Sequence, residues 1–173
     1  MNYEEYISVT PDFPKKGISF KDMSPILRNP EVFKSCIDDM CKIAEEYKPD
    51  VIIGPESRGF IFGSAMSYKM GIGFIMARKA GKLPGNTLKV SYALEYGTAT
   101  IEIPFNSIKK GDRVLLVDDL MATGGTFLAL KKLLEEAGAI PVACLTLINL
   151  EELHGENLVK LPCRSLLTLS DSH

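Results

Sequence analysis

The chain has 173 residues, of which 46% are hydrophobic and 24% are charged, and its formal net charge is −2. These values are ordinary for a globular domain, so the composition excludes disordered, collagen-like and coiled-coil chains. The slightly acidic balance creates no overall positive field that would attract nucleic acid or an anionic membrane, and no apolar run is long enough to span a bilayer. We therefore expect a single domain over residues 1–173 that binds neither nucleic acid nor membrane.

The N-terminus and the cysteines indicate the cellular compartment. The run Met1-Asn2-Tyr3-Glu4-Glu5 is acidic and lacks the basic and apolar regions of a signal peptide. No CxxC or zinc-ligand spacing occurs among the four cysteines, which are Cys36, Cys41, Cys144 and Cys163. We interpret them as reduced thiols and predict a cytoplasmic protein.

The first predicted helix begins at Asn29-Pro30-Glu31, where Asn supplies a cap and Pro suits the first helical position. Apolar residues then recur at helical spacing until Lys48-Pro49-Asp50 ends the helix. Apolar strands and further helices follow in alternation: strands over 51–54, 72–76, 114–117 and 139–148, and helices over 59–70 and 125–137. This alternation predicts an α/β fold with a parallel core sheet flanked by helices.

A different pattern lies between residues 78 and 103. Residues 89–96 alternate between apolar and polar side chains, and residues 98–103 alternate again. We therefore predict an antiparallel pair of strands that turns at Gly97. The preceding residues 78–87 are rich in Gly, Lys and Pro, which is typical of a mobile loop.

The most informative segment runs from Val114 to Thr126 and reads VLLVDDLMATGGT. An apolar strand leads into two carboxylates, Asp118 and Asp119, and then into a turn of small residues that opens a helix. Ligands of α/β sheets bind at the carboxyl ends of the strands, and a helix N-terminus with accessible N–H groups and hydroxyls suits a phosphate monoester. The predicted phosphate seat consists of Ala122, Thr123, Gly124, Gly125 and Thr126.

The two carboxylates repel a phosphate, so they must face another part of the ligand. Carboxylates accept hydrogen bonds from vicinal ribose hydroxyls, and they could stabilise positive charge that develops on a sugar ring. A solvated turn is the plain alternative. The segment is not a Walker loop, since no Gly-Lys-Ser/Thr follows, and it is not a dinucleotide fingerprint, since G-x-G-x-x-G is absent.

These features resemble the phosphoribosyl-pyrophosphate signature of the type I phosphoribosyltransferases. Further blocks resemble the adenine-specific branch of that family in order and spacing: Pro11–Pro14, Glu56–Phe60, Arg78–Gly85 and Leu94–Gly97. The resemblance therefore covers nearly the whole chain. It implies one phosphoribosyltransferase domain over 1–173, with a parallel core sheet, a flexible antiparallel loop, and a small hood formed by about 1–28 and part of 149–165.

The resemblance also implies a reaction. Members of this branch convert adenine and 5-phosphoribosyl 1-pyrophosphate into AMP and pyrophosphate with Mg²⁺, in purine salvage, and they are typically homodimers. The sequence offers no metal cage of its own, so we expect Mg²⁺ to be held mainly by substrate oxygens and water.

Residue by residue, the resemblance assigns pyrophosphate binding to four cations: Arg58, Arg78, Lys79 and Lys82. The last three would lie on a lid that excludes water, and the family often has a cis peptide before the arginine that Arg58 matches. A solvated basic loop is the alternative for the lid, and a surface cation is the alternative for Arg58.

The base would lie between Phe20 and Leu150, while Ser19 and Lys21 offer backbone groups to its edge. Ordinary core packing is the alternative for Phe20. Glu95 matches the family's proposed general acid/base and could accept the purine proton, or it could be a solvated strand residue. Tyr96 matches a tyrosine that helps to gate the site, with core packing as its alternative.

The N-terminal block departs from the family pattern. Lys16 replaces a usual proline, Lys21 replaces a usual arginine, and Ser8-Val9 stands where the family often has an arginine and a small residue. A 6-oxopurine base is therefore a second hypothesis, although no lysine is evident to read its O6. A regulator that senses phosphoribosyl pyrophosphate is a third, but such regulators carry DNA-binding domains and this sequence shows no basic stripe.

Overall fold

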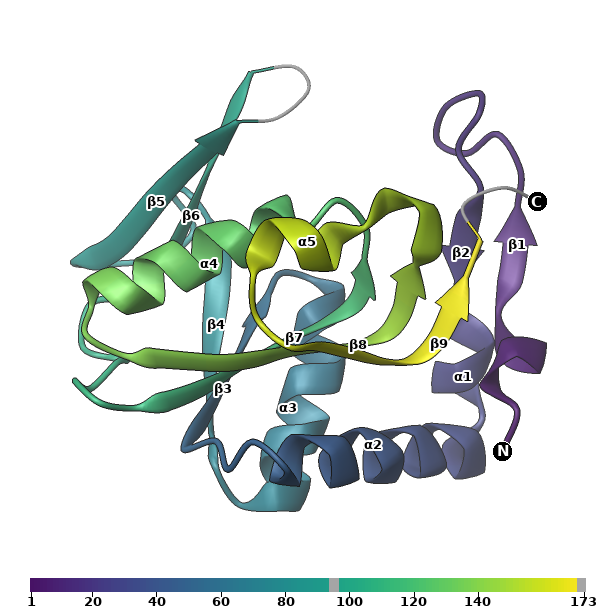
Figure 1. The fold of residues 1–173 in the computed structure, drawn as a ribbon, viewed down its shortest axis with the longest axis horizontal. Coiled ribbons are helices and arrows are strands. Elements are labelled where there is room, and N and C mark those ends of the chain that lie inside the picture. Colours follow the sequence, from purple (N-terminus) through teal and green to yellow (C-terminus); the bar gives the residue numbers. More distant parts are fainter. Residues whose placement is uncertain (94–96, 171–173) are drawn as a thin grey trace.

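A computed structural model describes residues 1–93 and 97–170 and places most strands in one seven-stranded sheet of order β5-β6-β4-β3-β7-β8-β9 (Figure 1). The strand bounds are β3 Val51–Pro55, β4 Gly73–Lys79, β5 Thr87–Ala93, β6 Thr98–Pro104, β7 Arg113–Met121, β8 Ile140–Leu150 and β9 Cys163–Leu169. In this order, the strands β4, β3, β7, β8 and β9 are parallel to one another. At one edge of the sheet, β6 pairs antiparallel with both β4 and β5. This mostly parallel sheet confirms the predicted fold class and the predicted antiparallel pair.

Helices cover both faces of the sheet. On one face lie α2 (Pro30–Glu45) and α3 (Arg58–Met70), and on the other lie α4 (Gly125–Glu136) and the short α5 (Gly155–Val159) (Figure 1). The alternation of side chains along β7 produces this sandwich, because Leu115 and Val117 pack on the α2–α3 side while Val114 and Leu116 pack on the α4 side.

The predicted cap of the first long helix is confirmed. The Asn29 side chain accepts hydrogen bonds from the backbone N–H groups of Glu31 and Val32, at 3.1 and 3.2 Å. These bonds satisfy two of the donors that a helix start leaves unpaired.

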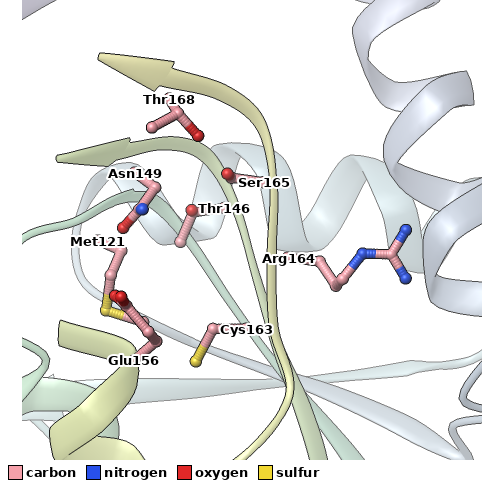
Figure 2. A pocket seen from close by; sticks show the side chains of 8 residues that line it. All are labelled: Met121, Thr146, Asn149, Glu156, Cys163, Arg164, Ser165 and Thr168. Carbon is pink, nitrogen blue, oxygen red and sulfur yellow. The ribbon is translucent and has the colours of Figure 1, made fainter. Parts of the chain in front are cut away.

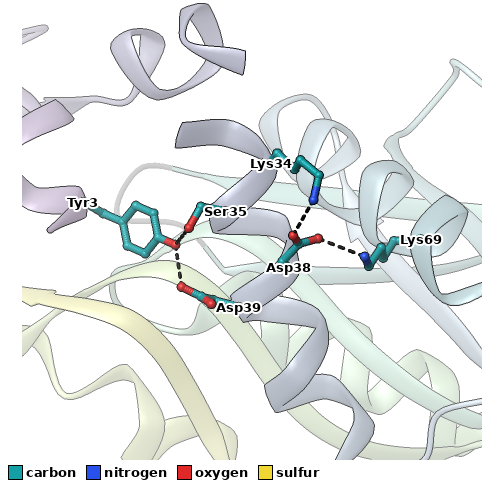
Figure 3. A network of polar contacts seen from close by, with 6 residues as sticks. All are labelled: Tyr3, Lys34, Ser35, Asp38, Asp39 and Lys69. Carbon is teal, nitrogen blue, oxygen red and sulfur yellow. Dashed lines mark hydrogen bonds and ion pairs between the residues drawn. The ribbon is translucent and has the colours of Figure 1, made fainter. Parts of the chain in front are cut away.

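Polar contacts tie this helix to its neighbours (Figure 3). Asp38 of α2 pairs with Lys34 at 2.9 Å and with Lys69 of α3 at 3.1 Å. On the next face of α2, the Tyr3 hydroxyl donates to the Asp39 carboxylate at 2.5 Å and lies 2.8 Å from the Ser35 hydroxyl. Tyr3 belongs to the 3-10 turn η1 (Tyr3–Tyr6), so this contact anchors the N-terminal segment.

Two predicted boundaries are wrong, and both errors concern polar residues inside strands. The strand predicted over 114–117 continues to Met121, because its ladder with β8 persists through Asp118↔Thr146 and Met121↔Asn149. Arg78 and Lys79 were assigned to a loop, but they end β4 and pair with β6. Residues 80–86 alone connect β4 to β5.

Several short elements gave no sequence signal. They are β1 Ser8–Thr10, β2 Phe20–Asp22, α1 Ser24–Arg28, η2 Glu151–Leu153 and α5, together with the longer edge strand β9. Three to five residues are too few for a periodic pattern, so their conformation is set by tertiary contacts. Over the residues that the structure describes, no helix is both long and apolar enough to cross a membrane.

Candidate active site

The phosphate seat connects β7 to α4 at the carboxyl end of the sheet. Gly124 has φ +88°, a left-handed conformation that suits glycine, and its carbonyl accepts the first hydrogen bond of α4 from Leu128 N at 2.9 Å. A Cβ on Gly125 would meet only the Thr123 hydroxyl, at 3.9 Å. The seat therefore borders open space, a hollow of about 90 Å³ lined by all five of its residues and by Asp118.

Asp118 and Asp119 leave β7 in different directions. The Asp119 N–H donates to an Asp118 carboxylate oxygen at 2.8 Å, and Asp118 lines the seat hollow together with two neighbouring hollows of about 150 and 240 Å³. Burial, and then the charge of Asp119, raise the pKa of Asp118 well above its ordinary value. Asp119 is itself buried and pairs with Arg58 Nε at 3.0 Å.

Two of the four predicted pyrophosphate cations, Arg78 and Lys82, pair with the Glu56 carboxylate, and Lys79 contacts it through its backbone N–H. Glu56 accepts hydrogen bonds from Lys82 Nζ at 2.5 Å and from the Lys79 backbone N–H at 2.7 Å, and Arg78 Nε lies 3.6 Å away. The hydrogen bond from Lys82 leads the interactions that lower the pKa of Glu56, so it is a carboxylate near neutral pH.

The sequence interpretation gave Glu56 no role, although it opens the block Glu56–Phe60. Its position next to Arg58 was the available signal. The non-proline cis peptide lies at Glu56–Ser57, one bond before the Ser57–Arg58 peptide.

Of the residues predicted to bind the base, Phe20 lies next to Arg58, which lines the hollow of about 240 Å³. The Arg58 guanidinium carbon is 5.7 Å from the centre of the Phe20 ring, and Phe20 packs edge-to-face on Phe13 at 5.3 Å. Along β2 the side chains alternate, so Ser19 and Lys21 are buried on the other side, where Lys21 Nζ donates to Ser19 Oγ at 2.8 Å. Leu150, the last residue of β8, is 6% exposed.

Two predicted residues, Glu95 and Tyr96, lie outside the described residues. Within the described part of the chain, no three His, Cys, Asp or Glu side chains are grouped so that they could hold a metal ion. A separate cavity of about 230 Å³ lies between α5 and the strands β8 and β9, where Met121, Glu156 and Cys163 are among its lining residues (Figure 2).

The arrangement defines the protein as one that binds a sugar phosphate. A phosphate seat and an adjacent carboxylate pair stand near a cationic group at the carboxyl end of a mostly parallel sheet, which suits a sugar phosphate that carries a second anionic group. An aromatic side chain stands beside that cleft and offers a face to a planar ring.

Comparison with known proteins identifies the family. The model of the phosphoribosyl transferase domain family matches residues 22–172. The adenine phosphoribosyltransferase of Brachyspira hyodysenteriae is 48% identical over 168 residues, which is 96% of this chain and 99% of that protein. The chain belongs to the adenine phosphoribosyltransferase family.

Solved structures agree with this assignment. The adenine phosphoribosyltransferase of Thermoanaerobacter pseudethanolicus gives a TM-score of 0.93 at 43% identity, covering 96% of this chain and 98% of that one. The Saccharomyces cerevisiae enzyme, complexed with an imino-altritol bisphosphate and adenine, gives 0.90 at 39% identity, covering 95% of this chain and 96% of that one.

Proposed function

We propose that the protein transfers the 5-phosphoribosyl group of phosphoribosyl pyrophosphate to adenine, producing AMP and pyrophosphate in purine salvage. One observation carries the proposal: Asp118 borders both the hollow of the phosphate seat and the hollow that contains Arg58 and Lys79. A substrate with a 5-phosphate at one end and a pyrophosphate at the other fits such a divided cleft. The relatives' names, and adenine in the yeast complex, support adenine as the base.

The roles follow from charge and position. The seat, Ala122–Thr126, binds the 5-phosphate through backbone N–H groups and the Thr123 and Thr126 hydroxyls. Asp118 accepts hydrogen bonds from the ribose hydroxyls, while Asp119 holds Arg58 in place at 3.0 Å. Pyrophosphate then draws Arg78 and Lys82 away from Glu56, because it carries more negative charge than one carboxylate, and the Lys79 side chain binds it as well.

The base is held by the hood, which we assign to about residues 1–28 and part of 149–165. Phe20 stacks on adenine, Leu150 covers the opposite face, and the backbone around Ser19 and Lys21 reads the edge. The alternation of β2 supports this arrangement, because it turns Phe20 toward Arg58 and leaves Ser19 and Lys21 buried behind.

In the reaction, the C1–oxygen bond to pyrophosphate breaks and a bond from an adenine ring nitrogen to C1 forms. Positive charge that develops on the ribose is stabilised by the Asp118 carboxylate. The base nitrogen then loses its proton, for which we propose Glu95 as the acceptor.

The role of Glu95 is tested with Glu95→Gln, which keeps the shape and a hydrogen-bonding group but cannot accept the proton. We expect the single-turnover rate to fall by about 10²–10⁴-fold, with far smaller changes in substrate affinity. Asp118 and the backbone would carry the electrostatic work alone if this rate fell by less than about threefold, below the range of general-base catalysis.

Magnesium enters with the substrate in this proposal. Because no three carboxylates of the described residues are grouped to hold a metal, Mg²⁺ would be held mainly by oxygens of the substrate and by water, beside the carboxylate of Asp118 that borders the hollow. The ion, when bound, neutralises charge on the leaving pyrophosphate. Calorimetry with Mg²⁺ alone should show little binding, and tight binding without ligand would contradict the proposal.

We also propose a cytoplasmic homodimer. On α3, the side chains of Ile61 and Tyr68 are 38% and 92% exposed and lie on the same side of the helix as Arg58, about one and three turns along. A second copy on this stripe would cover the apolar side chains next to the site. Light scattering should give a dimer mass for the natural chain and a monomer mass for Ile61→Glu with Tyr68→Glu.

The base and the class of function are tested together. The protein is incubated with labelled adenine, hypoxanthine or guanine, plus phosphoribosyl pyrophosphate and Mg²⁺, and the nucleotide is identified. AMP alone supports the proposal, IMP or GMP supports a 6-oxopurine enzyme, and binding without any product supports a sensor.

A further inference from the structure

The phosphate seat is supported from behind by α5, a segment from much later in the chain. A Cβ added to Gly155 would lie 2.6 Å from the Ala122 carbonyl oxygen and 3.1 Å from the Gly124 nitrogen. A Cβ added to Gly124 would in turn lie 2.6 Å from the Gly155 carbonyl oxygen. The two backbones therefore touch, and neither position leaves room for a side chain.

The other end of α5 is fixed to α4, the helix that follows the seat. Lys131 Nζ donates to the Val159 carbonyl oxygen at 3.1 Å. Val159 is fully buried and belongs to the same core cluster as Phe127 and Leu130 of α4. Lys131 also lies 3.8 Å from Glu135, and its side chain is 21% exposed. The short helix thus bridges the seat and the first turns of α4.

The sheet gives α5 little support of its own. The cavity of about 230 Å³ lies between α5 and the strands β8 and β9, and Glu156 of α5 projects into it (Figure 2). Because this space is not filled by packed side chains, α5 is held mainly by the close approach at Gly155, the Lys131 hydrogen bond and the buried Val159.

We propose that Gly155 and Lys131 are positioning residues that hold the phosphate seat in its binding geometry through α5. Neither residue touches the substrate. Gly155 sets how closely α5 approaches Ala122 and Gly124, and Lys131 keeps the helix from moving away. The identity of the bound phosphate rests on the proposed function, but the support of the seat does not.

The main test is Gly155→Ala. Gly155 is not in the left-handed region, so alanine suits its backbone and the added methyl acts only by pushing on Ala122, Met121 and Gly124. Small misplacements of positioning groups can cost up to about 10²-fold, so we expect the dissociation constants of AMP and ribose 5-phosphate to rise at least about tenfold. The KM for phosphoribosyl pyrophosphate should rise with them, while the affinities for adenine and for pyrophosphate stay within about twofold.

Gly63→Ala is the matched control. Gly63 lies on α3, away from the seat, and a Cβ there would lie 2.4 Å from the Phe74 ring. It should lower the melting temperature while leaving the affinity for ribose 5-phosphate unchanged. If Gly155→Ala weakens adenine and pyrophosphate as much as the phosphate ligands, or weakens none of them, the proposal is wrong.

Lys131→Met gives a second answer if Gly155→Ala does not fold. It removes the bond to Val159 and keeps most of the apolar stem, so the dissociation constant of ribose 5-phosphate should rise several-fold, and Lys131→Arg should restore it. Equal affinity in Lys131→Met and the natural chain would overturn the role of Lys131. Calorimetry with ribose 5-phosphate reports on the seat even if the natural chain makes no AMP, so failure of the proposed function remains distinguishable.

Discussion

In the proposed function, the phosphate seat and the hood bind different parts of the substrates in different ways. The seat is a single run of five small residues that follows β7 and includes the first two residues of α4, and it presents mainly backbone groups. The proposed hood includes the three-residue strands β1 and β2 and the end of β8, and it would present side chains such as Phe20. Every residue of β1 is exposed, whereas the seat is backed by α5.

This difference predicts how each region responds to mutation. In the seat, geometry is fixed by close backbone contacts, so an added methyl group changes the position of several donors at once. In the hood, the ring of Phe20 acts by its surface, so a similar ring can replace it. Changes in the seat should therefore be severe and specific for phosphate, while changes in the hood should be graded and specific for the base.

The largest effect is expected for Gly125→Val. The space beyond a Cβ at this position holds only the Thr123 hydroxyl at 3.9 Å, so valine is accommodated in the free protein but occupies the hollow of the seat. We expect kcat/KM for phosphoribosyl pyrophosphate to fall by about 10²-fold or more while the melting temperature changes little. AMP affinity, measured by calorimetry, should fall in parallel, and unchanged affinity for both ligands would remove Gly125 from the site.

The same contrast governs what the sequence could predict. The seat was predictable because one contiguous signal, from Val114 to Thr126, combines a buried strand, two carboxylates and a glycine turn. The pairing of Asp119 with Arg58 was not, because it depends on how the start of α3 packs beside the end of β7. The contact of α5 with the seat, and the pairing of Glu56 with Arg78 and Lys82, also join segments that are distant in the sequence. No local sequence pattern encodes such contacts.

Asp118→Asn should separate stability from binding within the seat region. The variant keeps an acceptor for the Asp119 N–H but loses the charge that binds ribose hydroxyls. Hydrogen bonds to charged groups contribute about 1.5–3 kcal/mol, so we expect kcat/KM to fall by at least about tenfold.

The same variant should lose activity but gain stability, and the gain in stability should depend on pH. Burial and Asp119 raise the pKa of Asp118, so its protonated form stabilises the native state at low pH and this contribution disappears as pH rises through the raised pKa. Above that raised pKa the ionised carboxylate opposes folding, and asparagine does not. Urea unfolding should show Asp118→Asn more stable than the natural chain, by a margin that shrinks on acidification, and a margin that grows on acidification would contradict the raised pKa.

In the hood, Phe20→Ala should weaken adenine binding alone. Stacking of a base on an aromatic side chain contributes about 1–3 kcal/mol, so the KM for adenine should rise by about five-fold or more. Phe20→Tyr keeps the ring and should restore most of the affinity, and the KM for phosphoribosyl pyrophosphate should change less than twofold. A larger effect on the phosphate ligand than on adenine would place Phe20 outside the base site.

The smallest effect is expected at the anchor of the hood, Tyr3. Burial, and then the hydrogen bond to Asp39, raise the pKa of Tyr3 to about 12, from about 10 in the unfolded chain. The native state therefore keeps this proton between about pH 10 and 12 while the unfolded state loses it, so the contribution of Tyr3 is complete below about pH 10 and declines above it. The slope is at most about 1.4 kcal/mol per pH unit.

Tyr3→Phe removes the titrating hydroxyl and leaves the ring in place. Because Asp39 and Ser35 lose a partner, the free energy of unfolding should fall by about 1 kcal/mol at pH 8. The difference between the natural chain and the variant should then shrink from about pH 10 upward, since only the natural chain loses the Tyr3 contribution there. This difference in the free energy of unfolding is measured by urea unfolding of both proteins at about pH 8, 10 and 11, a range set by these pKa values. Because the two proteins differ only at residue 3, a difference that stays constant over this range would show that Tyr3 does not hold its proton through Asp39, and that other contacts anchor the N-terminal segment.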